Sequence, residues 1–412
     1  MLAAERSVGT GFRTVPAPSL WVAEFREVVA VSATVGIAWL ILMLEAPFGE
    51  RRLLLSGVPV APFFFGMAAL IVTVLPGCRW YLAPTALLLV PVCVLGAMRF
   101  ISVRPDSGAS KLFNLLIVTI IAVPLLSNAA RHAGVETVAK TIVFIMSVLL
   151  AGAILFKLRY GFFDRQVLFF MNGPIVFGRL MGIAAILSLL ALRGMSRYVA
   201  FAVFALAVLW TMSKGPLLAL MIATLVSAFW LLKGSERWWF IASMLSAALV
   251  IVAFAWDTIA SFDWGRLVVL WDLLTKGFQY ASADPQSLGA RYIVYLTTIE
   301  QIFSQPLGAG LGSWSASIPE SFALDYPHNL LLELWSECGL VLGTIGLIPF
   351  VLFLAPGHPA LRGAGLFLLM AQMVSGDLLD ARYLLCFSLL AYLQYQQRTE
   401  ENTNGSPSPA PL

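Results

Sequence analysis

Runs of apolar residues about as long as a membrane is thick, separated by short polar links, fill most of the chain. The hydrocarbon core of a bilayer requires about 20 apolar residues per helix, within a range of roughly 17–25. Measured against that length, the pattern predicts an all-α polytopic integral membrane protein with about twelve transmembrane helices. The predicted spans are Val28–Leu44, Val58–Leu75, Trp80–Met98, Leu112–Asn128, Val138–Phe156, Ile175–Leu192, Tyr198–Ser213, Gly215–Leu232, Trp238–Trp256, Cys338–Pro356, Ala360–Ser375 and Tyr383–Gln396.

One connection differs from the others in its length and polarity. It covers residues 257–327, between the ninth and tenth predicted spans, whereas short links join the spans within residues 28–256. Because an even number of spans returns the chain to its starting side, this loop lies opposite both termini. Residues 1–27 precede the first span, residues 328–397 hold the last three, and residues 398–412 are predicted to be a disordered tail.

The long loop is predicted to carry short helices of its own. Its first part has apolar residues at helical spacing, which is typical of a helix on the membrane surface or on top of the protein. A second helix is predicted from Ser287, as its N-cap, to about Phe303. The stretch Pro306–Gly312, with the sequence PLGAGLG, is predicted to be a tight turn.

Composition supports the membrane assignment and narrows the chemistry. Hydrophobic residues make up 60% of the chain and charged residues only 12%, against roughly 25% charged in soluble domains. The net charge of +4 is too small to indicate a nucleic-acid partner. The four cysteines form no CxxC or Cys/His pattern, so we expect buried free thiols and no metal site. No Asp-x-Asp pair is present, which is consistent with a reaction that needs no metal or other cofactor.

Four cationic or titratable residues converge on the loop side and form the candidate site: Arg179, Lys214, Arg291 and His328. Arg179 lies about one turn into the sixth span, Lys214 in a tight link, and Arg291 in the first turn of a loop helix. His328 follows Pro327, which suits the first positions of a helix, so we place His328 in the first turn of the helix that enters the tenth span. Ionisable groups at membrane depth are costly and tend to face a cavity or a partner.

Arginine and lysine near helix N-termini are suited to binding phosphate, because the guanidinium fork and the oriented amides both match its oxygens. Each residue also has a structural alternative. Arg179 could snorkel to the interface, and Lys214 could simply mark a helix end. Arg291 could pair with Glu300 or Asp284, and His328 could only form hydrogen bonds at the helix start.

The charge distribution leaves the orientation open. The loop side carries more Lys and Arg than the terminal side, which is opposite to the positive-inside rule if the termini are cytoplasmic. Either the termini face outward, or the loop side is basic because it binds an anion.

At these residues the chain resembles the O-antigen ligase and Wzy-type polysaccharide polymerase superfamily. The resemblance rests on the order of several elements: Arg291–Tyr295, then Gln305–Trp314 with its PLxGxGxG turn, then the pair His328–Asn329, then Glu337–Leu340. Ser213–Gly215 is similar to the Ser-Arg-Gly element of that family, with lysine in place of arginine. Lysine keeps the charge but loses the bidentate fork.

The resemblance implies a membrane glycosyltransferase that moves a glycan from a polyprenyl (undecaprenyl) pyrophosphate donor to an acceptor hydroxyl. The acceptor is lipid A-core for a ligase, or another lipid-linked glycan for a polymerase of O-antigen or exopolysaccharide. It further implies the cytoplasmic (inner) membrane of a bacterium, cytoplasmic termini and a periplasmic loop. A diphosphate donor then accounts for the basic loop side.

Within that chemistry His328 is the expected base, since an unperturbed imidazole accepts a proton near neutral pH. Arg291, Lys214 and Arg179 are expected to stabilise the leaving pyrophosphate. His328 could instead contact phosphate, and Glu333 or Glu337 could orient the imidazole, although neither lies at ideal helical spacing.

Two other classes compete with this interpretation. A secondary transporter of a small or lipid-linked anion often shows helices interrupted by Gly or Pro in two related halves, but no internal repeat is visible here. A membrane acyltransferase could use His328 as its base, although the Arg and Lys residues suit a diphosphate better than a thioester.

Overall fold

The computed structural model describes the greater part of the chain. The described residues are 29, 31–43, 54–55, 58–59, 108, 111–112, 115, 118–162, 169, 173–211, 213–231, 234–235, 237–238, 241–242, 288–317, 326–376, 378 and 380–403. All structural statements below concern these residues.

The described part is almost entirely helical, as the sequence predicts. Apart from the apolar helix Val31–Met43, the principal helical elements are η2 (Val118–Ala122, a π-helix), α5 (Val123–Tyr160), α6 (Pro174–Ala191), α7 (Met195–Trp210), α8 (Lys214–Leu231), α12 (Leu288–Ser304), α13 (Trp314–Ser317), α14 (Leu330–Val351), η5 (Leu352–Leu354, a 3₁₀-helix), α15 (Pro359–Ser375) and α16 (Arg382–Thr403). Two-residue strands, β1 (Leu54–Leu55) and β2 (Val58–Pro59), pair antiparallel. Val58 and Pro59 therefore do not begin a helix, and that boundary of the second predicted span was wrong.

The apolar runs located the described helices well. Helices α6, α7, α8 and α15 begin and end within a few residues of their predicted spans. The described helices that are long and apolar enough to cross a membrane are Val123–Tyr160, Pro174–Ala191 and Leu330–Leu354, and shorter apolar helices include Met195–Trp210 and Pro359–Val374. The total of about twelve spans stays a prediction, because Trp80–Met98, most of Trp238–Trp256 and most of the long loop lie outside the described residues.

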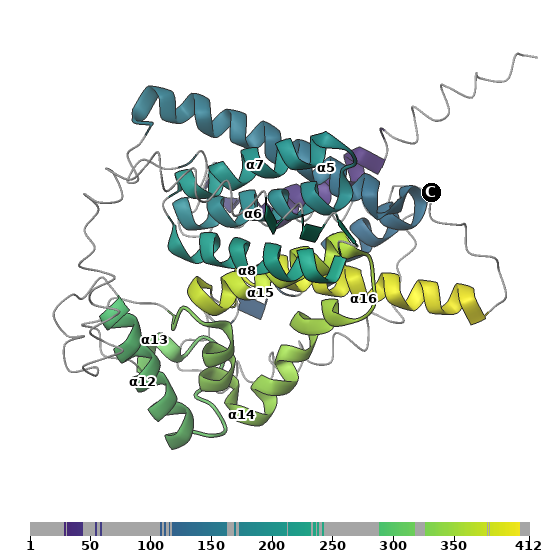
Figure 1. The fold of residues 1–412 in the computed structure, drawn as a ribbon. Helices are drawn as coiled ribbons and strands as arrows, with labels where there is room; N and C mark the ends of the chain where they lie inside the picture. Colours follow the sequence, from purple (N-terminus) through teal and green to yellow (C-terminus); the bar gives the residue numbers. More distant parts are fainter. Residues whose placement is uncertain are drawn as a thin grey trace, which may run out of the picture.

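Two helices continue where the sequence predicted an end. Helix α5 covers the end of the fourth predicted span and all of the fifth, with a break at Gly134, whose φ of 80° and ψ of 154° are not helical. Glycine reaches this conformation at little cost, so it permits a sharp change of direction. Helix α16 continues past Gln396 to Thr403 through polar residues and extends away from the bundle in Figure 1.

Helix α6 lies at the centre of the bundle and is buried along almost its whole length. It packs beside α5, α7 and α15, as Figure 1 shows. The approach to α15 is close: a Cβ added to Gly182 would lie 2.1 Å from the Phe367 ring. Small residues that let helices approach closely are typical of packing within membranes.

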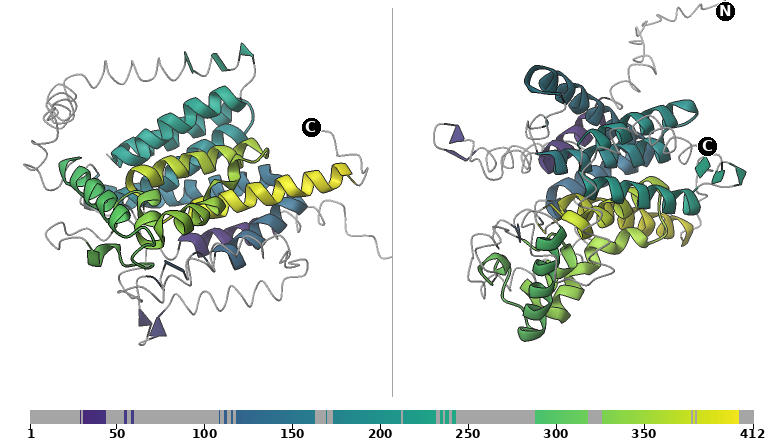
Figure 2. Two further views of the ribbon diagram at one scale, coloured as in Figure 1. Left: turned by 90° about the horizontal axis from the view of Figure 1, so that it is seen from below. Right: turned by 60° about the vertical axis from the view of Figure 1, so that its left-hand side comes forward.

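Helices α12, α13 and α14 form a second group beside this bundle (Figures 1 and 2). Helix α14 contacts α15 and α16 as well as α12, so it joins the loop segment to the bundle.

Candidate active site

His328 does not lie in the helix that the sequence assigned to it. Helix α14 begins at Leu330, and its N-cap is Asn329, whose side-chain oxygen accepts hydrogen bonds from the amides of Leu331 and Leu332. His328 stands before the cap with a φ of +57°, the one non-glycine residue in the described chain with a positive φ. The prediction that His328 lies in the first turn was wrong. Asparagine is a strong N-cap, so the helix begins directly after Asn329 and His328 lies outside it.

The backbone of His328 adopts the left-handed conformation. A residue other than glycine occupies this region only when the surroundings compensate the strain, and such residues cluster at functional sites. The His328 ring packs edge-on against Tyr326, with 4.4 Å between the ring centroids. The Asn329 amide donates to the Met373 carbonyl at 2.9 Å, which ties the start of α14 to the end of α15.

The predicted PLGAGLG turn is confirmed, and it packs against a break in α14. Gly308, Gly310 and Gly312 all have positive φ values, between 83° and 98°. Helix α14 breaks at Gly339, where φ is 81° and ψ is 168°. Backbone hydrogen bonds join the turn to the break. The amides of Ala309 and Gly310 donate to the carbonyls of Ser336 and Glu337, and the Leu340 amide donates to the Pro306 carbonyl.

The turn therefore completes the first segment of α14. The last carbonyls of a helix lack partners within that helix and need donors from elsewhere. Ala309 and Gly310 supply those donors, which defines the end of the segment Leu330–Cys338. His328 and Asn329 directly precede this short helical segment. We call residues 328–338 together the His328 segment.

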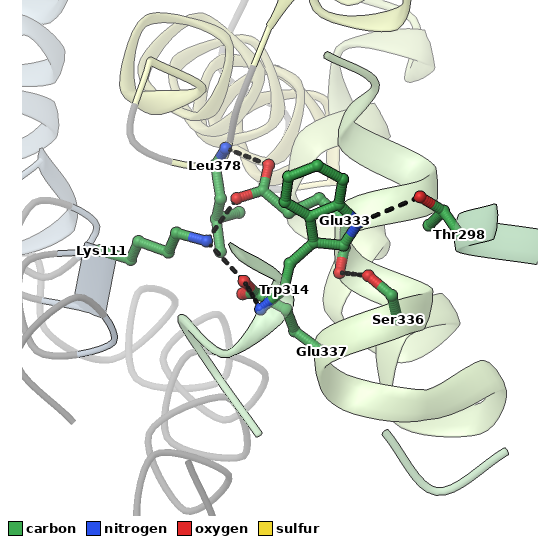
Figure 3. A network of polar contacts seen from close by, with 7 residues as sticks. All are labelled: Lys111, Thr298, Trp314, Glu333, Ser336, Glu337 and Leu378. Carbon is green, nitrogen blue, oxygen red and sulfur yellow. Dashed lines mark hydrogen bonds and ion pairs between the residues drawn. The ribbon is translucent and has the colours of Figure 1, made fainter. Parts of the chain in front are cut away.

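A buried ion-pair cluster, absent from the predicted site, holds the His328 segment from the side (Figure 3). The Lys111 ammonium lies 2.5 Å from a Glu333 oxygen and 2.7 Å from a Glu337 oxygen. Both carboxylates are at most 1% exposed and Lys111 is 5% exposed. Lys111, Glu333 and Glu337 are named the Lys111 cluster below.

Each carboxylate in the Lys111 cluster also accepts a backbone amide from another segment. Glu333 accepts the Leu378 amide at 2.7 Å, and Glu337 accepts the Trp314 amide at 3.3 Å. The Trp314 indole in turn donates to the Thr298 hydroxyl in α12 at 3.0 Å. The acids are directed toward Lys111 and these amides, and their orientation of the imidazole stays a hypothesis from the sequence.

Arg179 is buried and paired, rather than extended to an interface. Its guanidinium forms an ion pair with Asp380 in the link between α15 and α16, and it is 2% exposed. Arg382 lies on the other side of the same carboxylate, at 4.0 Å, and donates to the Leu42 carbonyl at 2.9 Å. Two guanidinium groups therefore approach one carboxylate.

Lys214 and Arg291 are located by their backbones alone, since their side chains lie outside what the structure describes. Lys214 is the first residue of α8, and Arg291 lies in the first turn of α12. A Cβ added to Gly178, the neighbour of Arg179, would lie 3.1 Å from Thr211 and 3.3 Å from Pro216. The start of α6 and the start of α8 therefore meet at the same end of the bundle.

The structure thus brings several of the predicted residues to one end of the bundle. The start of α6, the start of α8, the α15–α16 link and His328 are joined there by the contacts just described. The residues that sequence reasoning missed are Lys111 and Asp380. A signal for Lys111 was present, because two acids four residues apart in an apolar helix require a cation partner. Nothing local indicated which cation it was.

In the described part of the chain, no group of three or more His, Cys, Asp or Glu side chains is arranged to hold a metal ion.

Comparison with known proteins agrees with the geometry. Residues 199–351 match the family model described as O-Antigen ligase. This segment begins in α7 and includes α8, α12, the glycine turn and α14. No curated protein matches the chain. The match over this segment supports a relation to the O-antigen ligase family, and the apolar helices point to a membrane protein.

Proposed function

We propose, from the premise that this chain belongs to an O-antigen ligase-related family, that it transfers a glycan from a polyprenyl pyrophosphate donor to an acceptor hydroxyl. The reaction takes place on the periplasmic side of the bacterial inner membrane, and it needs no metal. The observation that carries the proposal is that Asn329, next to the strained His328, is tied to the end of α15, shortly before the link whose Asp380 pairs with Arg179. The start of α6, which holds Arg179, also packs against the start of α8.

The proposed reaction is a substitution at the anomeric carbon of the donor sugar. His328 accepts the proton of the acceptor hydroxyl as its oxygen forms the new bond to that carbon. The bond from the anomeric carbon to the pyrophosphate oxygen breaks, and polyprenyl pyrophosphate leaves. The proton remains on the imidazole until solvent takes it up.

The leaving group develops negative charge, and cations in a poorly hydrated site stabilise it. Arg179, Lys214 and Arg291 are the proposed partners of the pyrophosphate. Arg179 and Arg382 both approach Asp380, and this gathering of guanidinium groups supports a place for an anion beside it. The part-exposed Asp380, at 19%, supports access from the aqueous side.

The test is a reconstituted reaction with purified protein and a polyprenyl-pyrophosphate glycan, with and without a separate lipid acceptor. Longer glycans without the acceptor indicate a polymerase, and product only with the acceptor indicates a ligase. Addition of EDTA is expected to leave the rate unchanged. No product under either condition, with protein that remains folded in the detergent, contradicts the proposed function.

A further inference from the structure

The Lys111 cluster connects parts of the chain that are remote in sequence. Lys111 lies 226 residues before Glu337, just ahead of the fourth predicted span. Glu333 holds the α15–α16 link through the Leu378 amide, two residues before Asp380. Glu337 holds Trp314, which contacts α12 through Thr298. Figure 3 shows these contacts converging on the His328 segment.

The position of the His328 segment depends on such contacts. Its helix is interrupted at Gly339, so the rest of α14 does not continue it in a straight line. Its start is fixed by Asn329 on Met373, its end by the glycine turn, and its flank by Glu333 and Glu337. The two acids lie one and two turns after Asn329, on the face that meets Lys111.

Burying the two carboxylates and the ammonium of the Lys111 cluster carries a large desolvation cost. Well-packed apolar residues would often give equal or greater stability, whereas charges bring a defined geometry. A defined geometry matters at a reacting centre, because a displacement of about 1 Å can lower the rate about 100-fold.

We propose that Lys111, Glu333 and Glu337 are positioning residues for the glycan transfer. The cluster sets the His328 segment against two segments that adjoin the proposed diphosphate-binding arginines. One is the α15–α16 link, whose Asp380 pairs with Arg179 of α6, and the other is α12, whose first turn holds Arg291. This inference rests on the proposed function, and it adds to it a structural device that links the base to the cations.

The test compares variants of the full-length protein in the reconstituted reaction. Lys111→Met removes the cation, and Lys111→Arg restores it with a different shape. A triple variant, Lys111→Met with Glu333→Gln and Glu337→Gln, removes all three charges while the glutamine oxygens can still accept the Leu378 and Trp314 amides.

Two controls separate positioning from stability. Phe353→Leu changes a fully buried residue in η5, just after the far end of α14, and Glu136→Gln removes an exposed acid from the ion pair with Arg193. Phe353→Leu is expected to lower the thermal midpoint but not kcat, when kcat is measured well below that midpoint. Glu136→Gln is expected to change neither.

Lys111→Met is expected to lower kcat by about 10- to 100-fold at a temperature where it is folded, following the cost of a misplaced reacting group. The KM for the donor should change by less than about three-fold, because the diphosphate-binding cations are retained. Lys111→Arg and the triple variant should each recover part of the lost kcat. Unchanged kcat in Lys111→Met, with a lower thermal midpoint like that of Phe353→Leu, would overturn the inference.

Hydrogen exchange gives a second measurement that does not depend on transfer. Peptides covering Trp314 and Leu378 should exchange faster in Lys111→Met than in Phe353→Leu. Equal exchange in the two variants overturns the inference. If the wild-type protein shows no transfer, the proposed function fails, and the exchange result still decides whether the cluster positions these segments.

Discussion

Gly308 and Gly339 meet backbone to backbone: a Cβ added to Gly308 would lie 2.4 Å from the amide nitrogen of Gly339. The contact joins a loop motif to a break in a membrane helix. It explains why glycine is required on both sides, since each residue has a positive φ and no room for a side chain. The turn in the loop and the break in α14 therefore form one structural unit.

Gly339→Ala should disrupt this unit, and Gly134→Ala is its matched control. Both glycines have nearly the same backbone conformation, at φ 81° and ψ 168° for Gly339 and φ 80° and ψ 154° for Gly134. Alanine in such a conformation costs on the order of 1–3 kcal/mol at either site. At Gly339 the new Cβ would also lie 2.6 Å from the Pro306 oxygen, whereas nothing lies within 4 Å of it at Gly134.

Thermal unfolding in detergent and the transfer rate together measure the difference. Gly134→Ala should lower the midpoint by backbone strain alone. Gly339→Ala should lower it further and reduce kcat, because the turn that holds Trp314 against Glu337 is displaced. Equal losses in the two variants would show that the contact with the turn contributes nothing beyond the strain.

His328→Asn should remove the base while it preserves the backbone. Asparagine tolerates the left-handed region that His328 occupies at φ +57°. Loss of general-base catalysis is expected to lower kcat by about 100- to 10,000-fold. The thermal midpoint should stay close to that of the wild type.

The His328→Val variant, compared with His328→Asn, separates the loss of the base from the strain of the backbone. A β-branched residue is poorly tolerated at positive φ, so this variant should be less stable than His328→Asn by on the order of 1–3 kcal/mol, measured by thermal unfolding. Both variants should be equally inactive. Substantial activity in His328→Asn would mean that the left-handed turn, and not the imidazole, is what the reaction requires.

Some of this architecture can be predicted from local sequence, and some cannot. The length of each apolar run located α6, α7, α8 and α15, because a membrane helix satisfies its own backbone hydrogen bonds and needs only an apolar surface. The glycine turn was predicted from residue type alone. The start of α14 was misplaced by two residues, because the preference of proline for a first turn was outweighed by the Asn329 cap.

The ion pairs could not be predicted from spacing. Arg179 and Asp380 are 201 residues apart, and no periodic pattern connects them. A lone arginine at membrane depth predicts that a partner exists, but the partner is chosen by how the helices pack. The sequence therefore indicated which residues need partners, and the fold supplied Asp380 for Arg179 and Lys111 for the two acids of α14.

Asp380→Asn should reveal whether the Arg179 group binds the donor. Removing the shared carboxylate takes away the ion-pair partner of Arg179 and weakens the support of Arg382, so the free protein should lose roughly 3 kcal/mol or less, given that Asp380 is partly exposed. A bound diphosphate would replace the missing charge. The donor should then raise the thermal midpoint of Asp380→Asn more than that of the wild type.

The outcome that contradicts this assignment is a donor-induced shift no larger in Asp380→Asn than in the wild type. Arg382→Gln serves as a comparison, because Arg382 is held by the Leu42 carbonyl and is not a proposed donor ligand. It should lower stability without changing the KM for the donor.

Arg291→Ala and Lys214→Ala should weaken use of the donor. Each residue lies in the first turn of a helix at the proposed diphosphate site, and a hydrogen bond to a charged group contributes about 1.5–3 kcal/mol, or roughly 10- to 100-fold in kcat/KM. Lys214→Arg should retain more activity than Lys214→Ala, because arginine keeps the charge and adds a fork that matches two phosphate oxygens.

The measurement is the initial rate across a range of donor concentrations, with a fixed excess of acceptor. A rate that is unchanged at every donor concentration in Arg291→Ala would refute its contact with the diphosphate. Equal losses in Lys214→Arg and Lys214→Ala would show that position 214 requires lysine's shape rather than its charge.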